Sequence, residues 1–183
     1  MGKANGSREC SPDDRLRPSF DMLAELVGTA RCASAHPTIW VKERMPSKKD
    51  QELIDAATKA ISRRYRNDWQ EVGAAMRTRD GRIVTGVNID AYIGRIAVCA
   101  EAIAIGRAIT ETGDHGIETI VAVRHPKPGE PGKIAVVSPC GICRELIHDY
   151  DAKARVIVPD SGRAPKVVSI GELLPNKYKR GSE

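Results

Sequence analysis

The sequence Val98-Cys99-Ala100-Glu101, together with Ser138-Pro139-Cys140-Gly141-Ile142-Cys143, decides the fold that we expect of this chain. The first stretch places a thiol two residues before a carboxylate, at the start of an apolar run with helical spacing. The second places two thiols three residues apart at the start of another helix, where a proline is a common residue. We therefore expect the N-termini of two helices to point at one site.

Three cysteines at one point would bind one zinc ion, which takes thiolate ligands in tetrahedral sites. Three protein ligands leave the fourth position open, as in catalytic zinc sites, and we expect Glu101 to move protons for a water molecule there. The positive ends of the two helix dipoles should lower the pKa of the thiols. His125 and His148 are the candidates for a fourth ligand in this part of the sequence, and neither has a suitable spacing.

Each of these residues also has a simpler interpretation. A single Cys-x-x-Cys can be a redox pair, and Cys99 alone can be a small buried apolar residue. A carboxylate such as Glu101 is favourable at any helix N-terminus. The occurrence of all these features together, with a matching order of strands and helices, favours the zinc site.

Composition is typical of a soluble globular protein, with 183 residues, 41% hydrophobic and 29% charged. The sequence has no run of ~18 apolar residues and no apolar core of a signal peptide near its start, so we expect a cytoplasmic protein without a membrane partner. Five cysteines in that reducing setting indicate metal or redox chemistry rather than disulfides. The net charge of +5 permits a nucleic-acid partner, but aromatics are only 4%, so we expect none.

Residues 1–50 are expected to form an N-terminal extension that is partly mobile or packed on the domain surface. Ser11-Pro12-Asp13-Asp14 could cap a helix over Phe20–Thr29. Cys10, Cys32 and His36 resemble no common metal module in their spacing. The main domain is then expected over residues 51–183.

Within that domain the periodicity predicts helices alternating with strands after an initial hairpin. Asp80-Gly81 between two short apolar runs is a strong signal for adjacent antiparallel strands. Gly113 marks the end of a largely buried helix. The expected helices are Gln51–Tyr65, Ala100–Thr112, Gly141–Tyr150 and Ile170–Leu174. The expected strands are Val72–Met76, Ile83–Val87, Ile117–Val123, Arg155–Val158 and Lys166–Val168, with Ile134–Val137 as a short strand or a strand continuation. This order predicts an α/β fold in which helices cover both faces of a mixed sheet.

Cys-Ala-Glu followed by Pro-Cys-Gly-x-Cys-Arg resembles the signature of the zinc-dependent cytidine deaminase superfamily. The resemblance runs from about residue 51 to Tyr178, and it is similar to the small homotetrameric cytidine deaminases and to the related blasticidin S deaminases. The matching blocks are Val72-Gly73-Ala74-Ala75, Asp80-Gly81-Arg82-Ile83, Thr85-Gly86-Val87-Asn88, Ser138-Pro139-Cys140-Gly141 and Glu172-Leu173-Leu174-Pro175.

The resemblance implies a three-layer fold around a mixed five-stranded sheet, a homotetramer, and one zinc ion per subunit. It implies that Cys99, Cys140 and Cys143 bind the zinc, which would acidify a water molecule as the fourth ligand. Glu101 would accept a proton from that water and deliver protons to the ring nitrogen and the departing ammonia as C4 of a cytosine is attacked.

The resemblance also implies a set of substrate contacts. Asn88 would hydrogen-bond a ribose, and Asp90 stands where cytidine deaminases have a glutamate with the same task. The backbone near Ala100 and Ser138 would contact the base, and Tyr178 matches a C-terminal aromatic that closes the pocket.

Three residues around these positions complete the comparison with the family. Arg144 matches the family and could donate to a sulfur. The sequence departs from the family at Ala102, where cytidine deaminases carry an arginine, and at Gln70, which replaces a phenylalanine next to Trp69.

The function expected on this basis is zinc-dependent hydrolytic deamination of a cytosine nucleoside, namely cytidine, deoxycytidine or a modified analogue. The alternative within the same chemistry is a blasticidin S-type or other specialised aminohydrolase. A zinc-stabilised structural or binding module without chemistry is the third possibility. Editing of DNA or RNA is a weaker fourth, because the aromatic and basic residues of a strand channel are scarce.

Overall fold

A mixed six-stranded sheet forms the centre of the protein, as seen in a computed structural model that describes residues 45–179. The strand order is β2-β1-β3-β5-β6, and β4 pairs with β3. The strands are β1 (Val72–Thr78), β2 (Ile83–Val87), β3 (Ile117–Arg124), β4 (Ala135–Val137), β5 (Arg155–Asp160) and β6 (Arg163–Ser169). The helices are α1 (Lys48–Arg64), α2 (Ala100–Thr112), α3 (Gly141–Tyr150) and α4 (Ile170–Leu173), with a 3-10 turn η2 (Gly94–Ile96).

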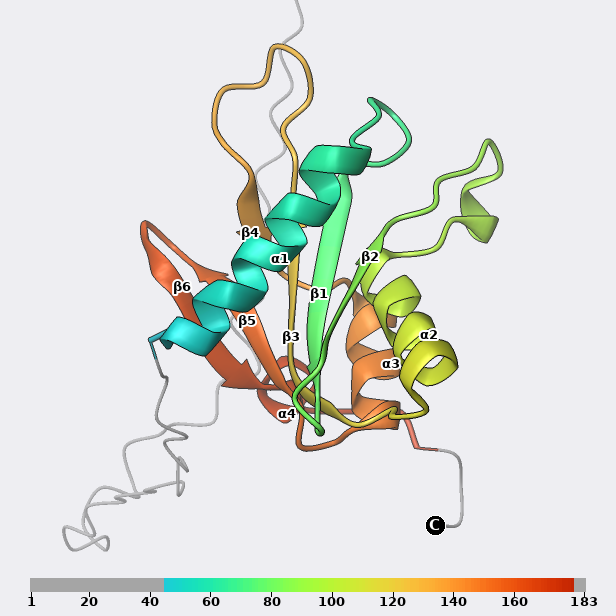
Figure 1. Cartoon of the computed structure of the whole chain (residues 1–183), viewed down its shortest axis with the longest axis vertical. Helices are drawn as coiled ribbons and strands as arrows, with labels where there is room; N and C mark the ends of the chain where they lie inside the picture. The colour runs from blue at the N-terminus through green and yellow to red at the C-terminus, as the bar shows by residue number, and fades with distance from the viewer. Residues whose placement is uncertain (1–44, 180–183) are drawn as a thin grey trace, which may run out of the picture. The chain divides into compact units, whose positions relative to one another are not determined.

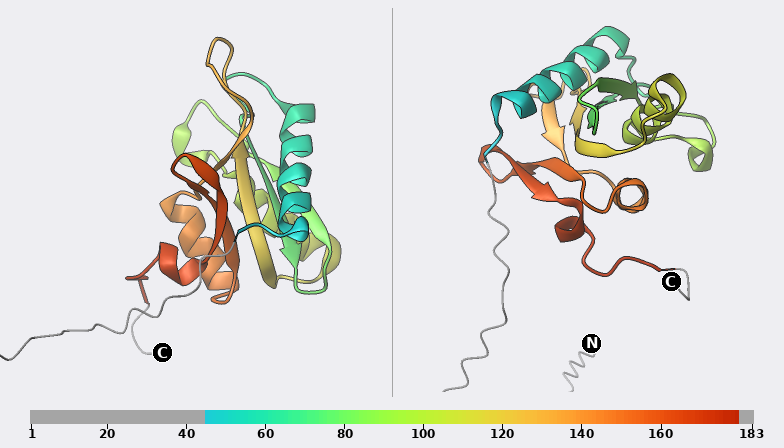
Figure 2. Two further views of the ribbon diagram at one scale, coloured as in Figure 1. Left: turned by 90° about the vertical axis from the view of Figure 1, so that its left-hand side faces the viewer. Right: turned by 60° about the horizontal axis from the view of Figure 1, so that its bottom comes forward.

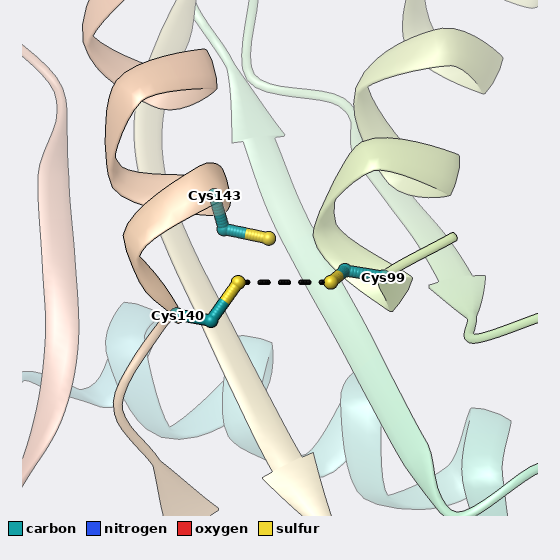
Figure 3. A group of neighbouring side chains, drawn as sticks. All are labelled: Cys99, Cys140 and Cys143. Atoms are coloured by element: carbon teal, nitrogen blue, oxygen red, sulfur yellow. Dashed lines mark hydrogen bonds between the residues drawn. The ribbon is translucent and has the colours of Figure 1, made fainter. Parts of the chain in front are cut away.

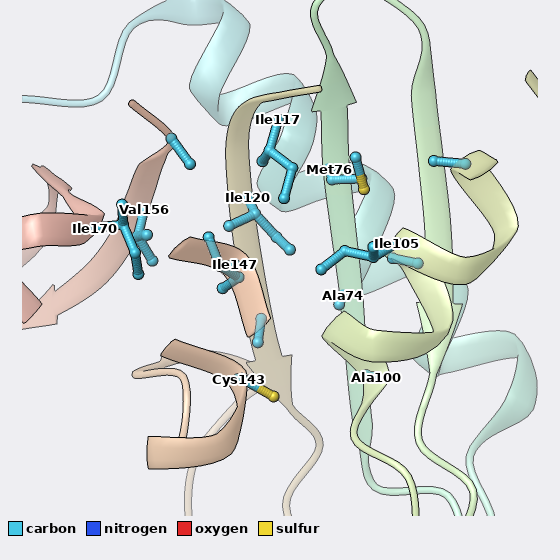
Figure 4. Packing of buried hydrophobic residues seen from close by; sticks show 14 of the residues in the cluster. Ala74, Met76, Ala100, Ile105, Ile117, Ile120, Cys143, Ile147, Val156 and Ile170 are labelled. Carbon is cyan, nitrogen blue, oxygen red and sulfur yellow. The ribbon is translucent and has the colours of Figure 1, made fainter. Parts of the chain in front are cut away.

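Helices cover both faces of this sheet, as the sequence predicted (Figure 1). On one face α1 packs alone, and its residues Leu53, Ala57 and Ile61 are fully buried against β1 and β3. On the other face lie α2, α3 and α4 (Figure 2). The larger core sits there, where Met76 of β1, Ile105 of α2, Ile120 of β3 and Ile147 of α3 meet (Figure 4). The fold is therefore a three-layer α/β arrangement.

The sheet has six strands rather than the expected five, because two strands share one edge of β3. The first part of that edge, from Thr119 to Val121, pairs in parallel with β5. The remainder, from Ala122 to Arg124, pairs antiparallel with β4. A short strand can fill the part of the edge that β5 leaves open, so the extra strand does not widen the sheet.

Local sequence signals placed most element boundaries correctly. The bounds of α2 and α3 are those expected, and Gly113 ends α2 in the left-handed conformation with φ 71°. Helix α1 begins at Lys48, three residues before Gln51, because Ser47 and Asp50 form a reciprocal capping box. No helix in residues 45–179 is long and apolar enough to cross a bilayer. The helix expected over Phe20–Thr29, together with Cys10, Cys32 and His36, lies outside the described residues.

Asp151, which follows α3, joins three parts of the chain. Its carboxylate accepts hydrogen bonds from the side chain of Arg79 at 2.8 Å, from the backbone N–H of Ile117 at 3.1 Å and from the backbone N–H of Lys153 at 2.9 Å. Burial alone would raise the pKa of Asp151, but the bond from Arg79 and the two backbone bonds hold that pKa below its ordinary value. The charged form is therefore the one that the fold stabilises.

Replacement of this carboxylate should reduce stability in a pH-dependent way. Because the pKa of Asp151 is lower in the folded state, its contribution is present above the unfolded pKa of about 4 and is lost as the pH falls through the folded pKa. We expect Asp151→Asn to lower the free energy of unfolding by about 2 kcal/mol at pH 7 and by much less at pH 3, measured by urea denaturation. Asp149→Asn is the control, since Asp149 is 61% exposed in its ion pair with Lys177. An equal deficit for Asp151→Asn at both pH values would contradict this account.

Candidate active site

The three cysteines of the two opening motifs lie together at the N-termini of α2 and α3 (Figure 3). All three Sγ atoms lie within 4.8 Å of one another, and Cys99 Sγ is 3.7 Å from Cys140 Sγ. Sulfurs that share a tetrahedral zinc at a Zn–S distance of about 2.3 Å lie roughly 3.8 Å apart, whereas disulfide sulfurs lie about 2.05 Å apart. The spacing and the soft donor set fit zinc. Within residues 45–179 this is the one group of three or more metal-binding side chains with such spacing.

Helix starts place each thiol. Cys99 is the N-cap residue of α2, Cys140 is the N-cap residue of α3, and Cys143 lies in the first turn of α3. Neither cysteine cap donates or accepts a side-chain capping bond in its helix. The sulfurs of both cap residues are therefore available for a ligand.

The expectation that helix dipoles lower the pKa of all three thiols is wrong for two of them. Burial raises the pKa of Cys99 and of Cys143, because both sulfurs pack against the core beneath the helix ends. Burial also opposes ionisation of Cys140, but the adjacent backbone N–H groups of Cys143 and Ile142 lower the pKa of that thiol. A bound cation would lower the pKa of Cys99 and Cys143, since a thiol that coordinates a metal ion loses its proton.

A hollow of about 260 Å³ opens beside the cysteines, slightly below the range of about 300–1,000 Å³ that is typical of ligand pockets. Glu101 lines it from the first turn of α2 and is only 5% exposed. Burial raises the pKa of the Glu101 carboxyl above its ordinary value. A carboxyl group that holds a proton more readily than usual, next to a metal site, is suited to proton transfer.

Four of the five expected substrate contacts line the same hollow, namely Asn88, Asp90, Ala100 and Ser138. Tyr178 is not among the lining residues and is 73% exposed. Its neighbour Lys177 pairs with Glu145 at 3.0 Å and with Asp149 at 2.6 Å, so the segment before Tyr178 is held along α3. A role for Tyr178 in a pocket stays a prediction.

Arg144 contacts carbonyl oxygens rather than sulfurs among the hydrogen bonds of the described residues. Its Nε donates to the carbonyl oxygen of Pro139 at 3.0 Å, and its Nη1 donates to that of Leu173 at 3.2 Å. It therefore fixes the turn before Cys140 against the end of α4. Three thiolates and one Zn²⁺ would carry a net charge of −1, which the helix N-termini and Arg144 can offset.

Sequence reasoning missed how the loop between β2 and α2 closes. The backbone N–H of Ile89 donates to the carbonyl of Val98 at 2.9 Å, and the N–H of Val98 donates back at 2.8 Å. This isolated bridge brings Asp90 and Cys99 to the same hollow. The apolar residues that precede Cys99 are the signal that could have indicated it. Trp69 does not line this hollow but an adjacent one, which it shares with Asp90.

Comparison with known proteins agrees with this geometry. The family model described as the cytidine and deoxycytidylate deaminase zinc-binding region matches residues 47–159, more than half of the chain. The chain belongs to this zinc-dependent deaminase family. It is a hydrolytic aminohydrolase that uses zinc, and the Cys99, Cys140 and Cys143 group could hold that ion.

Two curated relatives and two solved structures illustrate the similarity of this deaminase to others. It is 50% identical to blasticidin-S deaminase from Bacillus cereus over 135 residues, which cover 73% of this chain and 95% of that protein. It is 31% identical to cytidine deaminase from Mycobacterium tuberculosis H37Rv over 107 residues, which cover 58% of this chain and 71% of that protein. The crystal structure of cytidine deaminase from Mycobacterium leprae matches with a TM-score of 0.56 and 28% identity, covering 69% of this chain and 97% of that one. The cytidine deaminase from Bacillus anthracis shares the fold, with a TM-score of 0.60 and 24% identity, over 70% of this chain and 88% of that one.

Close contact between α2 and β2 sets the position of the deaminase's metal site. A Cβ atom on Gly86 of β2 would lie 2.6 Å from the carbonyl oxygen of Ala100 and 2.6 Å from the backbone nitrogen of Ala104. Backbone atoms cannot yield as a flexible side chain can. Only glycine at this position therefore lets the first turn of α2 rest on the strand.

Gly86→Ala should push α2 away from β2 and disturb Cys99 and Glu101 at its N-terminus. We expect a loss of about 2 kcal/mol in the free energy of unfolding and faster loss of zinc to a chelator. The measurements are thermal denaturation and the rate of zinc release to a chromogenic chelator. Gly106→Ala is the matched control, because a Cβ there meets nothing within 4 Å and α2 should gain up to about 1 kcal/mol. Equal behaviour of the two variants would contradict the steric argument.

Proposed function

We propose that this deaminase converts a cytosine nucleoside to the corresponding uracil nucleoside, consuming water and releasing ammonia. The observation that carries the proposal is the hollow in which the buried carboxyl of Glu101 lies beside Cys99 and Cys140. This arrangement joins a metal site to a proton carrier inside a space of ligand size. A structural zinc module would need no such hollow and no buried carboxyl facing it.

The proposed roles of the site residues are zinc binding and proton transfer. Cys99, Cys140 and Cys143 would hold the zinc, one ion per subunit. When bound, zinc supplies the Lewis acidity that lets water act as a nucleophile near neutral pH. As the C4–O bond forms, Glu101 would take one proton from the water and pass it to the ring nitrogen next to C4. It would then take the remaining proton of the new C4 hydroxyl and deliver it to the amino group, so that the C4–N bond breaks, ammonia leaves and a C4 carbonyl remains.

Recognition of the nucleoside is assigned to the polar lining of the hollow. The backbone of Ala100 and Ser138 would contact the base, while Asn88 and Asp90 would face the sugar. The Asp90 carboxylate can accept a hydrogen bond from a hydroxyl group, and Asn88 brings an amide. Tyr178 would contribute only after movement of its segment or from another subunit, since it is exposed and does not line the hollow.

Among cytosine nucleosides, we place blasticidin S first as the substrate to test. The similarity to blasticidin-S deaminase spans 95% of that relative at 50% identity, whereas the cytidine deaminase of Mycobacterium tuberculosis H37Rv matches at 31% over 71%. Cytidine and deoxycytidine are the second candidates, supported by Asn88 and Asp90 in the hollow. Both candidates use the same chemistry at C4.

The proposal is tested by assaying blasticidin S, cytidine and deoxycytidine by ultraviolet absorbance and ammonia release. We expect turnover of at least one of them by the native enzyme. Glu101→Gln should lower kcat by about a thousandfold while zinc content, measured by atomic absorption, stays at one ion per chain, since the ligands are intact.

The control is Glu111→Gln on the same helix, where the exposed Glu111 pairs with Arg107 away from the hollow. This variant should keep both its activity and its zinc. Full activity of Glu101→Gln would favour another proton carrier. No turnover of any of the three compounds by the native, zinc-loaded enzyme would overturn the proposal.

We also propose a homotetramer that acts in the cytoplasm. Large apolar side chains stand exposed around the hollow and its loop, among them Tyr92 at 96%, Ile142 at 77%, Ile93 at 65% and Ile96 at 63%. Exposed apolar residues in such number favour contact with another protein surface. Three free thiols at the site suit a reducing compartment.

Light scattering coupled to size exclusion should give a mass about four times that of one chain. Ile93→Lys should shift the protein towards smaller species, because a charge in an apolar interface leaves an unpaired buried group. Lys153→Glu, at an exposed turn after α3, should leave the mass unchanged. A monomeric native enzyme would contradict the tetramer without affecting the assignment of the chemistry.

A further inference from the structure

The side chain of Asn88 is engaged with the backbone of the segment that enters β1. Its Oδ1 accepts two hydrogen bonds, from the N–H of Glu71 and from the N–H of Val72, both at 2.9 Å. Its Nδ2 donates to the carbonyl oxygen of Trp69 at 2.7 Å. Its own backbone N–H donates to the carbonyl of Val72 at 3.0 Å. One residue at the end of β2 therefore holds three residues of another segment.

These contacts leave Asn88 little capacity for a substrate. An asparagine side chain offers two lone pairs on oxygen and two N–H donors. Both lone pairs and one donor are used by the backbone around Glu71, so one N–H remains. Asn88 can donate one hydrogen bond to a sugar, and it has no acceptor to offer.

The held segment forms part of the wall of the active-site hollow. Val72 lines the hollow together with Asn88 itself, as do Cys99 and Glu101. The carbonyl of Glu71 in the same segment accepts a bond from the N–H of His125 at 2.8 Å, which ties it to the end of β3 as well. Without the Asn88 side chain, the N–H groups of Glu71 and Val72 would lose their partners in a partly buried place.

We propose that Asn88 is a positioning residue, which clamps the Trp69–Val72 segment and so fixes the part of the hollow's wall that Val72 forms. This goes beyond a contact with the sugar, because the clamp acts on any ligand of the hollow. Asp90 differs, since its one bond among the described hydrogen bonds runs to the N–H of the adjacent Ala91 at 2.7 Å. The two residues thus have different tasks, although both line the same hollow.

The experiment compares Asn88→Ala with Asp90→Asn in a Trp40→Phe background, in which Trp69 is the remaining tryptophan. For Asn88→Ala we expect Tm to fall by about 5 °C and the emission of Trp69 to move to longer wavelength. We also expect KM for the nucleoside to rise about tenfold, with a smaller change in kcat. The inhibition constant of 1-methylcytosine, which has a methyl group in place of the sugar, should rise by the same factor.

For Asp90→Asn we expect KM for the nucleoside to rise, while Tm, Trp69 emission and inhibition by 1-methylcytosine stay as in the Trp40→Phe parent. The proposal is overturned if Asn88→Ala leaves Tm and Trp69 emission unchanged. It is also overturned if Asn88→Ala raises KM for the nucleoside but leaves the inhibition constant of 1-methylcytosine unchanged. That result would indicate that Asn88 contacts only the sugar. A fall in kcat without a rise in KM would indicate a purely structural role and would overturn it too.

The kinetic readouts rest on the proposed function, but Tm and Trp69 emission do not. If the enzyme had no activity on cytosine nucleosides, Tm and Trp69 emission of Asn88→Ala would still show whether Asn88 clamps the Trp69–Val72 segment. Failure of the clamp and failure of the proposed function are thereby distinguished.

Discussion

The convergence of two helix N-termini on three sulfurs is the constraint on which the rest of this structure depends. Helix N-termini carry partial positive charge, so two of them at one point repel each other unless negative charge lies between them. Here Cys99 caps one helix and Cys140 caps the other, with their sulfurs 3.7 Å apart. Thiolates on a bound zinc ion would provide that negative charge, and the helix ends would in turn stabilise a site of net charge −1.

Core packing holds the two helices in place before any ion binds. Below the site, Ile105 of α2 and Ile147 of α3 are buried against Met76 and Ile120 of the sheet. Burial of such side chains is worth about 2 kcal/mol each, so the position of the helix ends follows from the apolar core. The same packing desolvates Cys143 and Glu101 and raises the pKa of both groups. Burial in the fold thus disfavours the charged forms of Cys143 and Glu101. A divalent cation at the site would offset this cost of ionisation.

The sequence predicted what local signals control. Residue periodicity and Gly113 set the bounds of α2, and Asp80-Gly81 set the hairpin of β1 and β2. The missed features depend on contacts between distant segments. No local signal predicts that β5 leaves part of the β3 edge open to β4. The pKa values of the thiols likewise depend on burial by residues far along the chain. The start of α1 was misplaced although Ser47 and Asp50 fit a capping box in the sequence.

Asn88 and Asp90, which line the hollow, also show that contacts between distant segments decide what local sequence signals do not. The resemblance to the cytidine deaminases implied one task, contact with a ribose, for both Asn88 and Asp90. In the structure the pair separates, since Asn88 spends three of its four side-chain hydrogen-bonding positions on the backbone of residues 69–72. An amide can bond to N–H and carbonyl groups at once, whereas the Asp90 carboxylate can only accept. This chemical difference between the two side chains is why we assign the shape of the hollow to Asn88 and a contact with the substrate to Asp90.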